Sequence, residues 1–309
     1  MSIKSLRELF VGGLPASPAS RGIPLHRLFE ELPKFKDFLV VDLNLSGFTV
    51  ESHYYAVRGF LRWAKREGYN FVSVDALRSY LKTYLGRSKY TRANLIKGFR
   101  RFFRDYLGCP ELVSSFRLPY IRRGEGGRFK ELWFTKRDLQ RVYYALGESK
   151  NPERNQALFL LYATTGLRRL ELLELQPRHI DWSLRSIILD LDRGTKKTGI
   201  TFFNEEAEDA LKRMDLPTRE DERIFKIRGP GVKWVLKRAS RRCGVNPPIT
   251  PQALRVWFSY EMGKLGVPDR YIDIFQGRVP NSMLAQFYTP RGLEELKEVY
   301  DKAGLRVLE

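Results

Sequence analysis

The residues with the clearest potential for chemistry are two neighbouring arginines, Arg168 and Arg169, which follow a Thr-Gly turn and precede Glu171. We expect them in the first turn of a helix, where the helix dipole disfavours positive charge, so their guanidinium groups need an anion. Glu171 could supply it as a structural ion pair with Arg168, and a bound phosphate could supply it equally well. This stretch alone leaves both interpretations open.

The leucines of the same stretch, Leu167, Leu170 and Leu173, recur at roughly helical spacing, and we expect all three to lie in a core. Arg168 would then stand beside buried surface, where a cation is costly unless its charged head is paired.

A second candidate group lies further along the chain, in a helix that Thr250 caps and Pro251 opens. In it Gln252 and Arg255 are one turn apart, so they present their side chains to the same side. An arginine offers a planar fork of N–H donors that suits the oxygens of a phosphate.

Two lysines, Lys196 and Lys197, are expected at the tip of a hairpin, between strands over Arg185–Asp192 and Ile200–Phe203 that alternate with a period of two. Lysines in surface turns usually serve only solubility. They matter for chemistry only if the tip reaches a site.

Composition narrows the class of protein. The 309 residues carry a net charge of +19 with a pI near 9.9, spread over both halves of the chain, which indicates a polyanion as partner. The two cysteines are far apart and outside any Cys/His cluster, which predicts a reduced intracellular protein without structural zinc. Apolar runs are far below the roughly 18 residues of a membrane span, and an export signal is missing. We therefore expect a cytoplasmic, nucleoid-associated protein.

The elements that must position these residues read mainly as helices. Residues 1–22 read as loops around at most one short helix, and amphipathic helices follow over Thr49–Gly68, Val74–Leu85 and Tyr90–Leu107. Several helices have basic faces, which are either solvated surface or phosphate contacts. The candidate DNA contacts are Arg58, Arg62, Lys97, Arg101, Arg104, Arg122, Arg123, Lys237 and Arg241.

The second half alternates helices with short strands. We expect helices over residues 135–146, 152–161, 207–214, 231–243 and 268–275, and an amphipathic terminal helix after Pro290. A short strand is expected over Arg223–Ile227.

Taken together, these motifs resemble those of the tyrosine recombinases, or phage-type integrases. The resemblance is strong over about residues 135–290, and the N-terminal helices match only in size, charge and position. The matching elements are Thr165-Gly166-Leu167-Arg168 with Glu171, Lys-Thr-Gly at 197–199, Thr250 to Arg255, Gln276-Gly277-Arg278, and Tyr288 ten residues later.

The resemblance implies a mainly α fold with a small antiparallel β-sheet. An N-terminal segment, 1–22, would precede a helical core-binding domain that clamps DNA, 23–117. A linker, 118–131, would join it to the tyrosine-recombinase catalytic domain, 132–309, which ends in a helix.

The resemblance also implies roles for single residues. Tyr288 would attack a DNA phosphodiester and form a 3′-phosphotyrosine, while Arg168, oriented by Glu171, and Arg255 would clamp the phosphate. Lys197, with Lys196 as second choice, would protonate the leaving oxygen. Double-stranded DNA would be the partner, bound by a tetramer on two sites, without a metal or a small-molecule cofactor.

Two departures separate this chain from the family pattern. The family usually has histidine at the position of Gln252, and histidine or tryptophan at the position of Arg278. The two replacements in this chain are most similar to the fusellovirus-type integrases of archaeal viruses and plasmids. These changes leave two rivals to an integrase, a DNA-binding or architectural protein without turnover and a topoisomerase of the same chemistry. Tyr260, Tyr271 and Tyr300 compete with Tyr288 as nucleophile, but Tyr288 lies between a Gly-Arg turn and a Thr-Pro break with few apolar neighbours.

Overall fold

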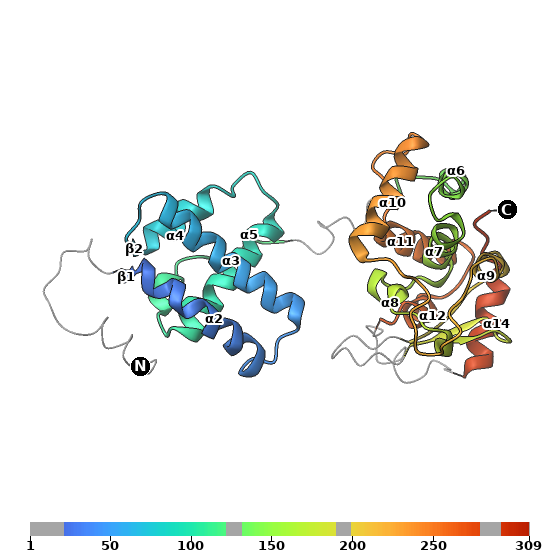
Figure 1. Ribbon diagram of the computed structural model, residues 1–309, viewed down its shortest axis with the longest axis horizontal. Helices are drawn as coiled ribbons and strands as arrows, with labels where there is room; N and C mark the ends of the chain where they lie inside the picture. Colours follow the sequence, from blue (N-terminus) through green and yellow to red (C-terminus); the bar gives the residue numbers. More distant parts are fainter. Residues whose placement is uncertain (1–21, 122–131, 190–198, 279–291, 309) are drawn as a thin grey trace, which may run out of the picture. The chain divides into compact units, whose positions relative to one another are not determined.

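The computed structural model describes residues 22–121, 132–189, 199–278 and 292–308 (Figure 1). The chain divides into two compact units, Met1–Phe129 and Lys130–Glu309. Both are mainly helical and each contains a small antiparallel sheet, so the predicted fold class is confirmed. None of the helices in the described ranges is long and apolar enough to cross a membrane.

The first unit is built around α3, which packs against α2 on one side and α5 on the other. The segment predicted as an amphipathic helix over residues 90–107 is helical, and its Phe99, Phe102 and Phe103 are fully buried. Its elements are β1 (Ile23–Pro24), α2 (Leu25–Val41), α3 (Gly47–Arg66), β2 (Phe71–Val72), α4 (Val74–Lys82), α5 (Lys89–Phe99), the π-helical η1 (Arg100–Tyr106) and the 3₁₀ turn η2 (Pro110–Leu112).

Helix α2 was not foreseen from the sequence. It contains Pro33, a residue that normally ends or kinks a helix. The helix nevertheless buries Leu28, Leu32, Phe35 and Leu39, which recur at helical spacing. Burial of this stripe therefore outweighs the local cost of proline.

The second unit holds the remaining elements. Its three-stranded antiparallel sheet has the order β3-β4-β5, with Ile187 opposite Thr201, so the predicted pairing across the hairpin is present. The elements are α6 (Lys136–Gly147), α7 (Pro152–Thr165), α8 (Arg169–Leu173), η3 (Pro177–His179), β3 (Ile180–Asp181), β4 (Ser186–Ile188), β5 (Ile200–Phe202), α9 (Glu205–Lys212), α10 (Gly229–Arg242), α11 (Pro251–Lys264), α12 (Asp269–Phe275) and α14 (Leu293–Ala303).

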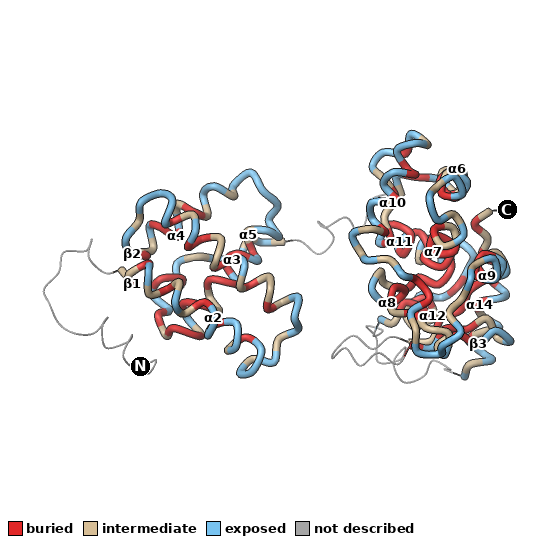
Figure 2. The backbone as a smooth tube through the Cα atoms, viewed as in Figure 1, coloured by how far each residue is buried: buried red, intermediate tan, exposed pale blue. Residues whose placement is uncertain are grey.

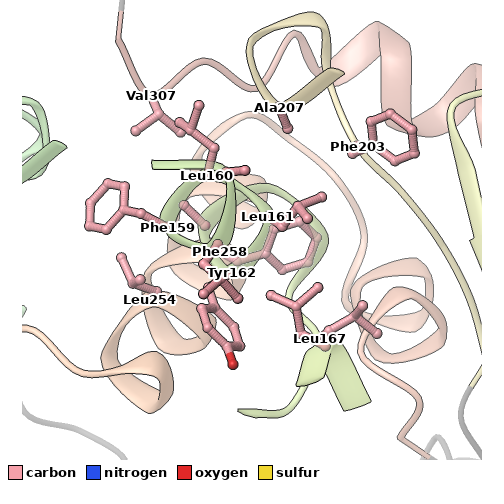
Figure 3. Packing of buried hydrophobic residues seen from close by; sticks show 14 of the residues in the cluster. Phe159, Leu160, Leu161, Tyr162, Leu167, Phe203, Ala207, Leu254, Phe258 and Val307 are labelled. Carbon is pink, nitrogen blue, oxygen red and sulfur yellow. The ribbon is translucent and has the colours of Figure 1, made fainter. Parts of the chain in front are cut away.

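Helix α7 forms the centre of this unit. From Ala157 to its end every residue of α7 is buried, which Figure 2 shows as red tube, and the helix packs against α6, α9 and α11. In Figure 3 its residues 159–162 lie among Leu254 and Phe258 of α11, Ala207 of α9 and the C-terminal Val307. The turn that follows α7 therefore starts from a rigid base.

Two predictions are corrected by the structure. Leu170 is 49% exposed, because α8 is short and its apolar side is formed by Leu172 and Leu173 instead. Residues 223–227 form no strand: Ile224 and Phe225 are buried, and Ile224 N donates to Leu175 O (2.9 Å), but no strand within the described ranges pairs with the segment. Its apolar residues satisfy the core without a ladder of backbone hydrogen bonds.

Candidate active site

The turn after α7 depends on a glycine. Gly166 has a φ of +64° in the left-handed region, and a Cβ there would lie 2.5 Å from Phe258 Cδ1. Leu167 N donates to Thr165 Oγ1 (3.2 Å), which holds the turn closed. The chain is thereby delivered to Arg168, the residue that immediately precedes α8.

Arg168 is fixed by Glu171 and by a loop distant in sequence. Its Nη1 donates to Glu171 Oε1 and its backbone N donates to Glu171 Oε2, both at 2.7 Å, while its Nη2 donates to Gly277 O at 3.2 Å. Glu171 is buried, whereas the Arg168 side chain is 30% exposed. The predicted ion pair is therefore present, and the Arg168 side chain remains partly exposed beside it.

Arg255 is held more deeply than Arg168. Thr250 caps α11 by accepting from Ala253 N (3.1 Å), as the sequence predicts. Arg255 is 3% exposed; its Nη1 donates to Gly166 O and its Nη2 donates to Gln276 O (2.6 Å). The two predicted arginines thus reach the same short loop, residues 276–278, from different helices.

The electrostatics of this loop favour an anion. Burial, together with the charges of Arg168 and Arg278, lowers the pKa of Arg255 to about 9. Arg278 is exposed and contacts Asp273, whose own pKa is raised by burial (Nη1–Oδ1 3.5 Å). A cluster of mutually repelling cations at one loop is stabilised by a bound phosphate.

The described end of the lysine hairpin borders the same loop. A Cβ at Gly199 would lie 2.9 Å from Ile274 O and 3.9 Å from Gly277 Cα, so the two backbones are in close contact. Lys196 and Lys197 precede Gly199 directly but lie outside the described residues, as does Tyr288. Gln252 is described and lies exposed at the start of α11.

The end of α7 is supported by side chains whose role the sequence did not reveal. The carbonyls of residues 164, 165 and 166 accept hydrogen bonds from Tyr300 (2.8 Å), Thr201 (2.7 Å) and Arg255. Carbonyls at a helix C-terminus favour a nearby cation, which suits Arg255. Apolar periodicity in the sequence predicts Tyr300 only as a core residue. No local sequence signal predicts that Thr201 donates a hydrogen bond to the end of α7.

The three competing tyrosines differ in how far they are buried. Tyr300 is completely buried, and burial raises its pKa. Tyr260 on α11 is 55% exposed beside Lys264, whereas Tyr271 on α12 is partly buried against the core and contacts Arg270.

The candidate DNA contacts differ in exposure and in ion pairing. Arg101 and Arg104 both form ion pairs with Asp105, which neutralises part of that face of the first unit. Within the described ranges, Lys237 and Arg241 on α10 are exposed and have no ion pair. Arg58 is half-buried, Arg62 and Lys97 are exposed, and Arg122 and Arg123 lie outside the described residues. Among the side chains that the structure describes, no group of three or more His, Cys, Asp or Glu could hold a metal ion.

Known structures with a similar fold include lambda integrase bound to DNA, with a TM-score of 0.62 and 14% identity over 86% of this chain and 96% of that one. A lambda integrase tetramer bound to a Holliday junction has a TM-score of 0.61 and 15% identity, covering 92% of this chain and 84% of that one.

Sequence comparison gives the family. Tyrosine recombinase XerA from Thermococcus onnurineus is 27% identical over 289 residues, which cover 89% of this chain and 96% of that protein. A family model described as "Phage integrase family" matches residues 132–292, just over half of the chain. The chain therefore belongs to the phage integrase family, and it is a tyrosine recombinase, an enzyme that acts on DNA.

Proposed function

We propose that the enzyme cuts one DNA strand by attack of the Tyr288 phenolic oxygen on a phosphodiester. The phenol gives up its proton to solvent as the new bond joins its oxygen to phosphorus; the bond from phosphorus to the 5′-oxygen breaks, and the leaving oxygen takes up a proton. The 3′-phosphotyrosyl link is then attacked by the 5′-hydroxyl of a partner strand, which releases the tyrosine. The observation that carries this proposal is the convergence of Arg168 and Arg255 on the loop 276–278.

Each of these two arginines is anchored in a way that leaves donors for a phosphate. A guanidinium has five N–H groups, and in both cases two of them bond to acceptors among the described residues. The carbonyls that hold Arg255 fix its position without cancelling its charge. The remaining N–H groups would bind the non-bridging oxygens as their charge grows, and the loss of one such donor costs about 10²–10³ in rate.

The other roles follow from position and chemistry. Lys197, with Lys196 as alternative, would protonate the leaving 5′-oxygen, and the contact of Gly199 with the loop supports a tip close to the arginines. Arg278 would add a third cation. Gln252 can donate a hydrogen bond to the phosphate, but its amide cannot transfer a proton near neutral pH.

We further propose a tetramer that holds two DNA sites, with the first unit clamping the duplex and α10 adding phosphate contacts. The similarity in fold to a lambda integrase tetramer on a Holliday junction supports this assembly. Integration or excision of an archaeal virus or plasmid is the proposed biological task, performed at the nucleoid. It rests on the replacements at Gln252 and Arg278.

A suicide DNA substrate, nicked so that the cleaved fragment diffuses away, tests the chemistry. Wild type is expected to accumulate a covalent adduct and Tyr288→Phe none, while Arg168→Ala and Arg255→Ala should form it about 10²–10³ more slowly. Tyr260→Phe is the matched control, because this exposed tyrosine lies outside the site.

Three results would contradict the proposal. An adduct undiminished in Tyr288→Phe would exclude this nucleophile, and a wild type that binds DNA without any adduct would indicate an architectural protein. Relaxation of supercoiled plasmids lacking the recognised site would indicate a topoisomerase.

A further inference from the structure

The side chain of Gln276 forms a closed ring of hydrogen bonds with Arg255. Gln276 is fully buried at the C-terminal end of α12, and its Nε2 donates to Arg255 O at 2.8 Å. In return, Arg255 Nη2 donates to Gln276 O at 2.6 Å. Both ends of the arginine, its backbone and its guanidinium, are thus tied to one residue.

Stability alone does not account for a glutamine at position 276. Its Oε1 is buried and, within the described part of the chain, lacks a hydrogen-bond donor, which costs about 1–3 kcal/mol. The carbonyl of Arg255 does not depend on Gln276, because Ser259 Oγ also donates to it (3.3 Å). An apolar side chain of similar shape would therefore serve the core at least as well.

We infer that Gln276 is a positioning residue, which holds the Arg255 guanidinium in the geometry that grips the phosphate. The inference rests on the proposed role of Arg255. The Gln276 backbone is held at the end of α12, which packs on α11. Without the Nε2 bond, that packing and the Nη2 bond are what still join Gln276 to Arg255, so the angle at which Nη2 meets the carbonyl can vary. Gln276 itself does not touch DNA; it limits the orientations of a group that does.

The ring of hydrogen bonds between Gln276 and Arg255 lies against the turn at Gly166. Gly166 provides the second carbonyl anchor for Arg255, and a Cβ at Gly166 would lie 3.0 Å from Gln276 Cγ. The stem of Gln276 therefore packs directly on the turn that leads to Arg168. One side chain thus contacts the structures that hold both arginines of the clamp.

The test compares Gln276→Met with wild type in the full chain. Single-turnover cleavage of suicide DNA at saturating protein should slow by about 3–10-fold, the effect expected from one hydrogen bond. DNA affinity should stay within about twofold, and the thermal midpoint should stay unchanged or rise because a buried, unpaired oxygen is removed. Gln156→Met is the matched control, because Gln156 makes a similar Nε2 bond to Tyr143 O (3.3 Å) outside the site.

A double-mutant cycle separates positioning from a purely structural role. If Gln276 acts through Arg255, Gln276→Met should cause no further loss of cleavage in an Arg255→Lys background. The inference is overturned if cleavage by Gln276→Met is normal, if its loss persists undiminished beside Arg255→Lys, or if its loss is matched by a lower thermal midpoint. Gln276→Leu replaces the methionine variant if that one does not fold. Normal cleavage by Arg255→Lys and Arg255→Ala would instead refute the proposed clamp.

Discussion

The substitution Gly166→Ala tests the turn on which the site is built. An alanine at a φ of +64° costs about 1–2 kcal/mol of backbone strain, because its Cβ crowds the neighbouring carbonyl. The same Cβ would lie 2.5 Å from Phe258 Cδ1 and 2.8 Å from Cε1, an overpacking that costs about 1–3 kcal/mol more. We therefore expect the free energy of unfolding of the second unit to fall by about 2–5 kcal/mol.

The matched control is Gly304→Ala. Gly304 also follows a helix with a left-handed φ, +61°, but nothing lies within 4 Å of a Cβ there, so only the strain of about 1–2 kcal/mol is expected. Urea unfolding followed by tryptophan fluorescence compares the two, since four of the five tryptophans belong to the second unit. Equal losses for both variants would refute the packing argument. At temperatures where both are folded, only Gly166→Ala should also slow cleavage, because Gly166 O holds Arg255.

Three further predictions concern charge, pH and the hairpin. Lys237→Gln should lower the slope of log affinity for DNA against log salt by about 0.9, whereas Lys212→Gln, whose ammonium is ion-paired within α9, should leave the slope unchanged. Burial and nearby cations lower the pKa of His53, so the first unit should lose stability as pH falls below 6.5, the pKa of histidine in the unfolded chain. In urea titrations from pH 7.5 to 5, His53→Phe should remove this pH dependence. The control His26→Asn, at an exposed position, should leave it in place. Thr201→Val removes a buried hydrogen bond of 2.7 Å to the end of α7. It should lower the free energy of unfolding by about 1–3 kcal/mol, measured by thermal unfolding. An unchanged thermal midpoint would show that this hydrogen bond is dispensable.

Helix starts were predictable because their determinants are neighbours in sequence. Thr135 and Asp138 form the capping box of α6, and Thr250 with Pro251 opens α11, as their spacing indicates. The ion pair of Arg168 with Glu171 was foreseen for the same reason, since residues three positions apart meet across one helical turn.

The surroundings of Arg255 could not be predicted in this way. Its anchors, Gly166 and Gln276, lie 89 and 21 positions away along the chain. Likewise Thr201 and Tyr300 reach the end of α7 over separations of 36 and 136 positions. Hydrophobic periodicity shows which face of a helix or strand is apolar. It does not show which carbonyl of another element a side chain on that helix or strand will contact.

Packing between distant segments also decided which predictions were wrong. Leu170 fits a helical stripe, yet α8 is too short to continue it. Residues 223–227 have the pattern of a strand, but no strand in the described part of the chain pairs with them. The sequence by itself determined the family motifs, the local caps and the mainly helical fold, because these depend on residues within a few positions of each other. Only the tertiary structure decided that two arginines meet at one loop and that a buried glutamine ties one of them in place, because those contacts exist only after distant segments pack together.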